Sequence, residues 1–222
     1  MKSASGLSLT QRQTPRDNFG SYACELMRYF TNPNAWLGGF YELAIELGPR
    51  SDERLLAALT AVWSNPNLDG VYLDDDTEPW QQTRQAITAE SLQVDHLYGL
   101  ARLPNGVTIA CGACLIREDD GPDWLILYLP MGALGTAYSV GGHPFEPNSE
   151  TSRPWREILD AWLARIGVAV YDRVQYRLAL VGFEVSGMAY ADELMQAGIP
   201  TERDMGYLWP EGDRVTFYPC TK

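Results

Sequence analysis

In the stretch VYLDDDTEPW, four carboxylates follow an apolar run: Asp74, Asp75, Asp76 and Glu78. Carboxylate oxygens are the ligands that Mg²⁺ and Ca²⁺ prefer. The spacing lacks the alternating ligands and central glycine of an EF-hand, and successive side chains of an extended chain point to opposite sides. We therefore predict no metal site, and interpret the run as a solvated strand end placed before the positive end of a helix. The alternative is a contact surface for a basic partner, with Trp80 as its aromatic anchor.

Cys111 and Cys114 form a Cys-x-x-Cys motif, CGAC, a spacing found in zinc sites and in thioredoxin-type redox sites. The motif lies inside an expected strand, whereas redox motifs of this kind begin a helix whose dipole lowers the thiol pKa. The other cysteines, Cys24 and Cys220, are isolated in the sequence, so a second ligand pair is missing. Residues three apart in a strand also point to opposite faces. We interpret both thiols as small buried side chains.

His143 lies in a long loop, residues 132–152, that is rich in glycine, serine and proline. Loop histidines can act as general bases, and Ser139 and Glu146 are close to it in sequence. Ser139 does not lie in the G-x-S-x-G elbow of an α/β-hydrolase nucleophile. A surface histidine is therefore the favoured interpretation. The alternative is a small-molecule enzyme whose pocket lies beside this loop and uses His143 with carboxylates such as Glu146.

Glu42 and Glu46 share one face of an expected strand over 40–47 and could form a carboxylate pair for acid/base chemistry. The opposite face is apolar. Such alternation is typical of a half-buried strand with one face in water. We therefore expect both glutamates to be solvated.

Several chemistries are excluded by the residue types that the chain lacks. Lys2 and Lys222 are its only lysines, so the body of the chain offers no amine for a Schiff base or for pyridoxal phosphate. His96 and His143 are its only histidines, which excludes a three-histidine zinc site. A Gly-Lys-Ser/Thr phosphate-binding motif is also absent. We expect no cofactor.

The chain of 222 residues carries 29 acidic and 17 basic side chains, a net charge of −12. This balance argues against nucleic acid and anionic membranes as ligands, and it would attract a basic protein. The sequence lacks both a run of about 18 apolar residues that could span a membrane and the apolar core of a secretory signal at its N-terminus. We expect a cytoplasmic protein. Its oligomeric state is left open.

Hydrophobic periodicity and turn residues divide the chain into alternating elements. Helices are expected over residues 18–31, 52–64, 77–89, 155–170 and 189–197. Strands are expected over 40–47, 70–73, 97–103, 107–118, 124–131 and 176–187, and in a last hairpin on either side of residues 210–213.

These elements predict an α+β fold: a mostly antiparallel sheet with a central β-meander, and amphipathic helices packed on one face. Two α/β halves are the alternative arrangement. Residues 1–17 are expected to be a flexible arm, and residues 18–222 one domain that would divide, if at all, near the 132–152 loop.

The leading functional hypothesis is a non-catalytic, acidic protein-binding module. One concrete form is an immunity or antitoxin-like neutraliser of a basic protein. Its contact residues would be Asp74, Asp75, Asp76, Glu78 and Trp80. The enzyme that uses His143 is the alternative, and a subunit that pairs through its 7 tryptophans and 12 tyrosines is a third hypothesis.

Overall fold

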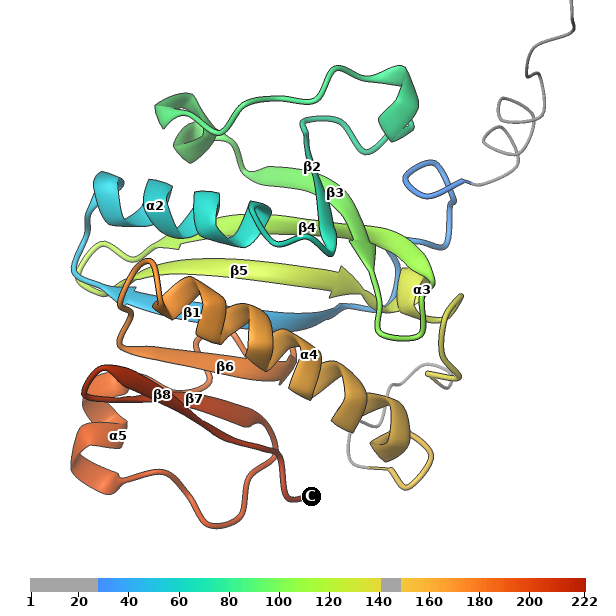
Figure 1. Ribbon diagram of the computed structural model, residues 1–222. Coiled ribbons are helices and arrows are strands. Elements are labelled where there is room, and N and C mark those ends of the chain that lie inside the picture. The colour runs from blue at the N-terminus through green and yellow to red at the C-terminus, as the bar shows by residue number, and fades with distance from the viewer. Residues whose placement is uncertain (1–27, 141–148) are drawn as a thin grey trace, which may run out of the picture.

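The computed structural model describes residues 28–140 and 149–222. Within these residues eight strands form one sheet in the order β2-β3-β4-β5-β1-β6-β7-β8 (Figure 1). All seven neighbouring pairs are antiparallel, which confirms the predicted α+β class and sheet type. The strands are β1 Phe40–Gly48, β2 Leu68–Tyr72, β3 His96–Arg102, β4 Thr108–Arg117, β5 Asp123–Pro130, β6 Leu178–Phe183, β7 Gly206–Glu211 and β8 Arg214–Tyr218. The helices are α2 Asp52–Trp63, α3 Met131–Leu134, α4 Arg153–Tyr171 and α5 Ala191–Ala197, with short 3₁₀ helices η1 Pro79–Gln81 and η2 Ala89–Gln93.

The predicted meander is the run β3-β4-β5, and β1 pairs with β5 on its far side. The first strand of the described chain is therefore central, and all but its first residue are buried. No helix in the described part of the chain is both long and apolar enough to cross a bilayer.

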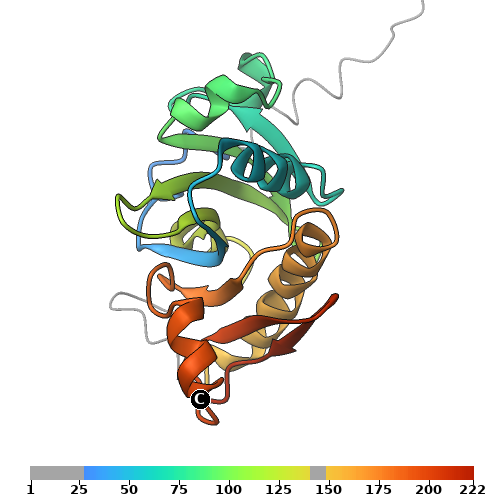
Figure 2. The same cartoon turned by 90° about the vertical axis from the view of Figure 1, so that its left-hand side faces the viewer.

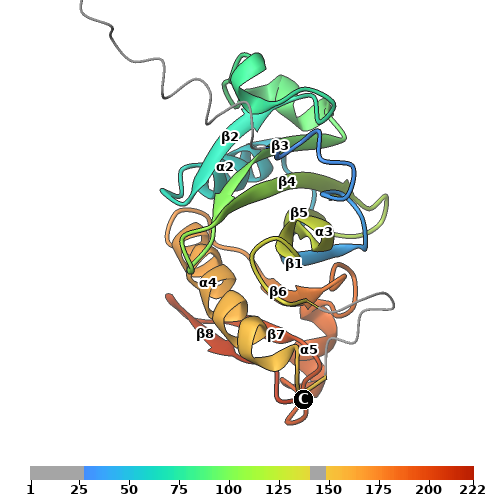
Figure 3. The same ribbon diagram turned by 90° about the vertical axis from the view of Figure 1, so that its right-hand side faces the viewer.

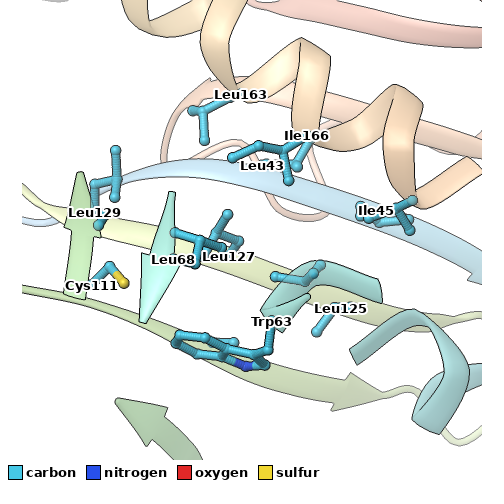
Figure 4. Close-up of a cluster of buried hydrophobic side chains, with 14 of the residues drawn as sticks. Leu43, Ile45, Trp63, Leu68, Cys111, Leu125, Leu127, Leu129, Leu163 and Ile166 are labelled. Carbon is cyan, nitrogen blue, oxygen red and sulfur yellow. The ribbon is translucent and has the colours of Figure 1, made fainter. Parts of the chain in front are cut away.

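The two long helices, α2 and α4, lie on the same face of the sheet, as predicted, while the short helix α5 lies on the other (Figures 2 and 3). The side chains of β1 alternate between two cores accordingly. Leu43 and Ile45 belong to the larger core under α2 and α4, and Ala44 belongs to the smaller one under α5. Figure 4 shows the larger core, where Leu163 and Ile166 of α4 approach β1.

Helix α2 begins where the sequence predicts, because Ser51 caps it. The Ser51 hydroxyl accepts a hydrogen bond from the Arg54 backbone N–H at 3.2 Å. At the other end of α2, Trp63 packs on two glycines that pair across β2 and β3. A β-carbon at Gly70 would lie 2.6 Å from the Trp63 ring, and one at Gly99 would overlap the same ring. Glycine at both positions makes room for the indole.

Two predicted helices are wrong in the described residues. At the end of the helix expected over 18–31, residues 29–31 form bends and residue 28 is not helical. Residues 18–27, and the arm over 1–17, lie outside the described residues. The helix expected over 77–89 is wrong: η1 covers only residues 79–81 of it, η2 begins at residue 89, and the segment between them is neither helix nor strand. In that segment the Gln85 backbone N–H donates to the Val71 carbonyl at 2.8 Å, so the chain pairs with the edge of β2 instead of coiling.

Candidate functional site

The three aspartates that follow β2, Asp74, Asp75 and Asp76, are here called the acidic turn. Asp74 and Asp76 are exposed and Asp75 is half-buried, and one carboxylate oxygen from each lies within 4.8 Å of the others. The expectation that successive side chains diverge is wrong here, because residues 75–77 bend and are not extended. Exposed acidic groups often gather in this way without an ion, so their proximity assigns no metal.

Hydrogen bonds within the loop hold the acidic turn in one shape. The Asp74 carboxylate accepts from the Asp76 backbone N–H and from the Thr77 hydroxyl, both at 2.8 Å. The Gln82 amide donates to the Asp74 carbonyl at 2.5 Å and also to the Thr77 carbonyl. The carboxylates of Asp75 and Asp76 take no part in these bonds and remain available.

Glu78 has a different role from the three aspartates. Its side chain is only 4% exposed. Its carboxylate accepts from the backbone N–H groups of Tyr29, Phe30 and Thr31 at 3.1, 3.3 and 3.0 Å, and from the Thr31 hydroxyl at 2.7 Å. Glu78 thus fastens the loop to residues 29–31 and does not contribute to the exposed surface.

Apolar side chains adjoin the acidic turn on the surface. Leu73 is 49% exposed and Trp80 is 41% exposed. The Trp80 ring meets Tyr29 edge-to-face, with 6.3 Å between ring centroids. The only base between residues 69 and 95, Arg84, pairs with Asp69 at 2.9 Å. In the described residues no lysine or arginine forms an ion pair with the acidic turn.

The acidic turn lies close enough to an aromatic cluster on β3 to affect it. The pKa of Tyr98 is raised, first by burial and then by the charges of Asp75, Asp74 and Asp76. Trp36 packs edge-to-face on Tyr98, with ring centroids 5.3 Å apart. A surface of carboxylates beside aromatic rings suits cationic side chains, because ring faces and carboxylates both attract positive charge.

A histidine–tyrosine contact continues this surface, and sequence patterns did not predict it. Tyr128 of β5 reaches across β4 to His96 of β3, where its hydroxyl lies 2.9 Å from Nδ1. The ring passes over Gly112, where any β-carbon would overlap it. Burial raises the pKa of Tyr128 well above its ordinary value. The one sequence feature that could have indicated this contact is Gly112, the glycine inside the CGAC motif.

The two cysteines of that motif lie on opposite faces of β4, as predicted. Cys111 is in the larger core and Cys114 packs against the smaller one. Burial raises the pKa of Cys114 to about 12 and also raises that of Cys111, so both are held as thiols near neutral pH. Neither is placed to share a metal or a disulfide with the other.

Glu42 and Glu46 are buried, so the interpretation of a solvated strand face is wrong. They are 6% and 1% exposed. Glu42 accepts from the Ser186 backbone N–H at 3.0 Å, and Glu46 accepts from the Ala191 backbone N–H at 2.7 Å at the start of α5. Burial raises the pKa of each. They hold the segment after β6 against the sheet.

A second polar cluster lies between β1 and α4. The Tyr41 hydroxyl donates to Asp160 Oδ1 at 2.5 Å and accepts from Arg156 Nε at 3.4 Å. All three residues are buried. Burial is the main cause that raises the pKa of Asp160 from its ordinary value of 3.8 to about 6, while the Tyr41 hydrogen bond and Arg156 lower it.

This raised pKa makes stability depend on pH. Because the folded-state pKa exceeds the unfolded value, the contribution of Asp160 is largest below about pH 4 and is lost as pH rises through 6. Asp160→Asn keeps an acceptor for Tyr41 and cannot ionise. We expect urea unfolding to show the variant more stable than wild type by on the order of 2 kcal/mol at pH 7.5, and equal to it near pH 4. The exposed Asp172→Asn is the control, and a gain for Asp160→Asn that is the same at both pH values would contradict the prediction.

The residues of the enzyme hypothesis are only partly described. His143 and Glu146 lie outside the described residues, and Ser139 is exposed. The catalytic role of His143 and Glu146 stays a prediction.

Searches of protein-family models, of curated proteins and of solved structures found no match to this chain. The chemistry of the described residues is therefore the basis for the functional proposal.

Proposed function

We propose that this chain is a non-catalytic binding module of the cytoplasm that captures a basic protein through the acidic turn and Trp80. An immunity or antitoxin-like neutraliser is the concrete form that we favour. The observation that carries the proposal is the state of the acidic turn. Its three carboxylates are gathered within 4.8 Å, held by hydrogen bonds of Asp74 and Gln82, and paired with no base among the described residues.

Pre-organisation is what makes this arrangement suited to binding. A loop that already has its bound shape loses little conformational entropy when a partner docks. The net charge of −12 would speed the encounter with a basic protein. Leu73 and Trp80 would add apolar contact area beside the carboxylates, and tryptophan is a frequent anchor of protein interfaces. Glu78 is buried and holds the loop through its hydrogen bonds to residues 29–31, so it would not touch the partner.

The test is a triple variant, Asp74→Asn, Asp75→Asn and Asp76→Asn. Asparagine at position 74 keeps one side-chain oxygen, which can accept from the Asp76 backbone N–H, and its amide N–H can donate to the Thr77 hydroxyl in place of the second bond. The loop should therefore keep its shape while losing three charges. After affinity capture from cells of the source organism, the captured protein is purified and titrated by calorimetry. We expect its Kd to rise about tenfold or more, and the wild-type affinity to fall with salt.

The matched control removes three other exposed carboxylates, with Asp119→Asn, Asp120→Asn and Asp213→Asn. It has the same net charge as the triple variant, so it separates a local contact from a general electrostatic effect. Equal affinities for the two variants would refute the acidic turn as the contact surface.

A further inference from the structure

A cavity of about 450 Å³ opens where three segments of the chain meet. These segments are the turn that precedes β1, the start of β4 with the residues before it, and the helix α3 with the residues that follow it (Figure 1). The volume falls within the range of about 300–1,000 Å³ that sites for small molecules span. The cavity shares no residue with the acidic turn or with Trp80.

The floor of this cavity is apolar and buried. Ala35, Ile109, Ala110 and Ala133 line it, and each is 3% exposed or less. Val107, which is 37% exposed, extends the apolar surface toward the rim. Apolar atoms of a ligand that enter the cavity would leave water for an apolar surface, which is favourable.

The polar groups at the rim can donate hydrogen bonds to an anion. Arg28 is exposed and forms no ion pair within residues 28–140 and 149–222. Asn32 Oδ1 accepts from the Asn34 backbone N–H at 3.0 Å, so the Asn32 amide Nδ2 is left to donate. The described lining contains no aspartate or glutamate, although the molecule carries a net charge of −12. The rim therefore suits a carboxylate.

Hydrogen bonds join the three segments to one another. The Ala133 backbone N–H donates to the Ala35 carbonyl at 2.9 Å, which joins α3 to the turn before β1. The Asn105 side-chain amide donates to the Ala137 carbonyl at 3.0 Å, which joins the turn between β3 and β4 to the chain after α3. A ligand would meet a cavity that is already formed, which lowers the entropy cost of binding.

We propose that this cavity binds a small amphipathic carboxylate, a molecule whose apolar body ends in a carboxylate group. The apolar body contacts the floor, and Arg28 and Asn32 bind the carboxylate. A guanidinium presents paired donors that match the two oxygens of a carboxylate. Sites for small molecules commonly combine an apolar lining with a few placed polar groups in this way. The proposal goes beyond the partner surface and does not depend on it.

The other hollows of the described surface suit this ligand less well. Glu157 and Asp160 line the one beside β8, and four carboxylates line the one at the start of α5, so both would repel an anion. The hollow beside Arg102 and Arg165 has no acid in its described lining, but fewer apolar side chains line it. The cavity beside α3 is the one that joins an acid-free rim to a buried apolar floor.

The test uses hexanoate as the probe and hexanol as its neutral match, because both carry an apolar chain of similar length. Each is titrated into the full chain near neutral pH at constant ionic strength, while NMR follows the methyl signals of Val107 and Ile109. We expect saturable shifts with hexanoate, with a Kd in the millimolar range. Hexanol should bind about fivefold more weakly or worse, because it lacks the charge that Arg28 pairs with.

Two variants test the polar groups at the rim. Asn32→Asp keeps the acceptor for the Asn34 backbone N–H and replaces the donor with a negative charge. It should weaken hexanoate binding about tenfold or more, and Arg28→Gln should weaken it about fivefold or more. Hexanol binding should stay unchanged in both. Arg173→Gln, which removes an exposed arginine outside the cavity, is the control and should leave both probes unaffected.

Arg28 is exposed and Asn32 is half-buried, so both variants should fold, and unchanged backbone amide signals far from the cavity will confirm this. Shifts that grow linearly without saturation would overturn the proposal. Equal affinities for hexanoate and hexanol, or equal hexanoate affinities for Arg28→Gln and Arg173→Gln, would overturn it as well.

Discussion

Gly132→Ala is expected to destabilise the protein by about 3 kcal/mol or more, enough to leave much of the chain unfolded. A β-carbon at Gly132 would overlap the backbone carbonyl of Asn34 and lie 2.9 Å from that of Ala35. These are backbone atoms, so they cannot swing aside as a flexible side chain would. They are also fixed, because the Gly132 and Ala133 backbone N–H groups each donate at 2.9 Å to residues 35–37.

The control is Gly135→Ala, three residues later at the end of α3. Gly135 has helical backbone angles, φ −59° and ψ −19°, and its β-carbon would come no closer than 3.3 Å to its neighbours. Alanine there should change the free energy of unfolding by less than about 1 kcal/mol. Urea unfolding of the two variants measures the difference, and equal midpoints would show that residues 34–35 can move away.

Gly132 also shows where sequence patterns stop being informative. It begins the glycine-rich stretch 132–152, in which a glycine is expected to serve a turn. Its actual requirement is a close approach to residues almost a hundred positions earlier in the chain. No local pattern records such a contact.

A contact with residues distant in the sequence also explains why Glu42 and Glu46 of β1 are buried although the local pattern predicted them to be solvated. Alternation over 40–47 predicted the strand and its boundaries well, because a period of two is a local property of extended chain. Which face meets water is a tertiary property. The segment from Ser186 to Ala191 lies about 145 positions later and supplies backbone donors that bury Glu42 and Glu46.

The candidate partner surface was predictable in part. Charge and composition indicated that the aspartates after β2 would be exposed; Asp74 and Asp76 are exposed, and Asp75 is half-buried. The prediction grouped Glu78 with them because the four carboxylates are close in sequence. Glu78 instead turns inward, where three backbone N–H groups of residues 29–31 need an acceptor. That need could not be foreseen, because those residues were expected to be helical and to satisfy their own backbone.

Glu78→Ala should therefore act on the fold. It leaves three backbone donors and the Thr31 hydroxyl without their acceptor, and a buried donor that loses its partner costs about 1–3 kcal/mol. Since some of these groups are only partly buried and can reach water, we expect a loss of about 3 kcal/mol in the free energy of unfolding. Hydrogen exchange should quicken at Tyr29, Phe30 and Thr31.

Glu90→Ala is the matched control, because Glu90 belongs to the same loop and bonds only the exposed Thr88 hydroxyl. Its unfolding midpoint should equal that of wild type. A contact residue would give the opposite pattern, with Glu78→Ala weakening capture of the basic partner while stability and exchange stay unchanged. If Glu78 is the anchor described here, any loss of capture should track the loosening of the loop, and the triple asparagine variant should lose capture with the loop still ordered.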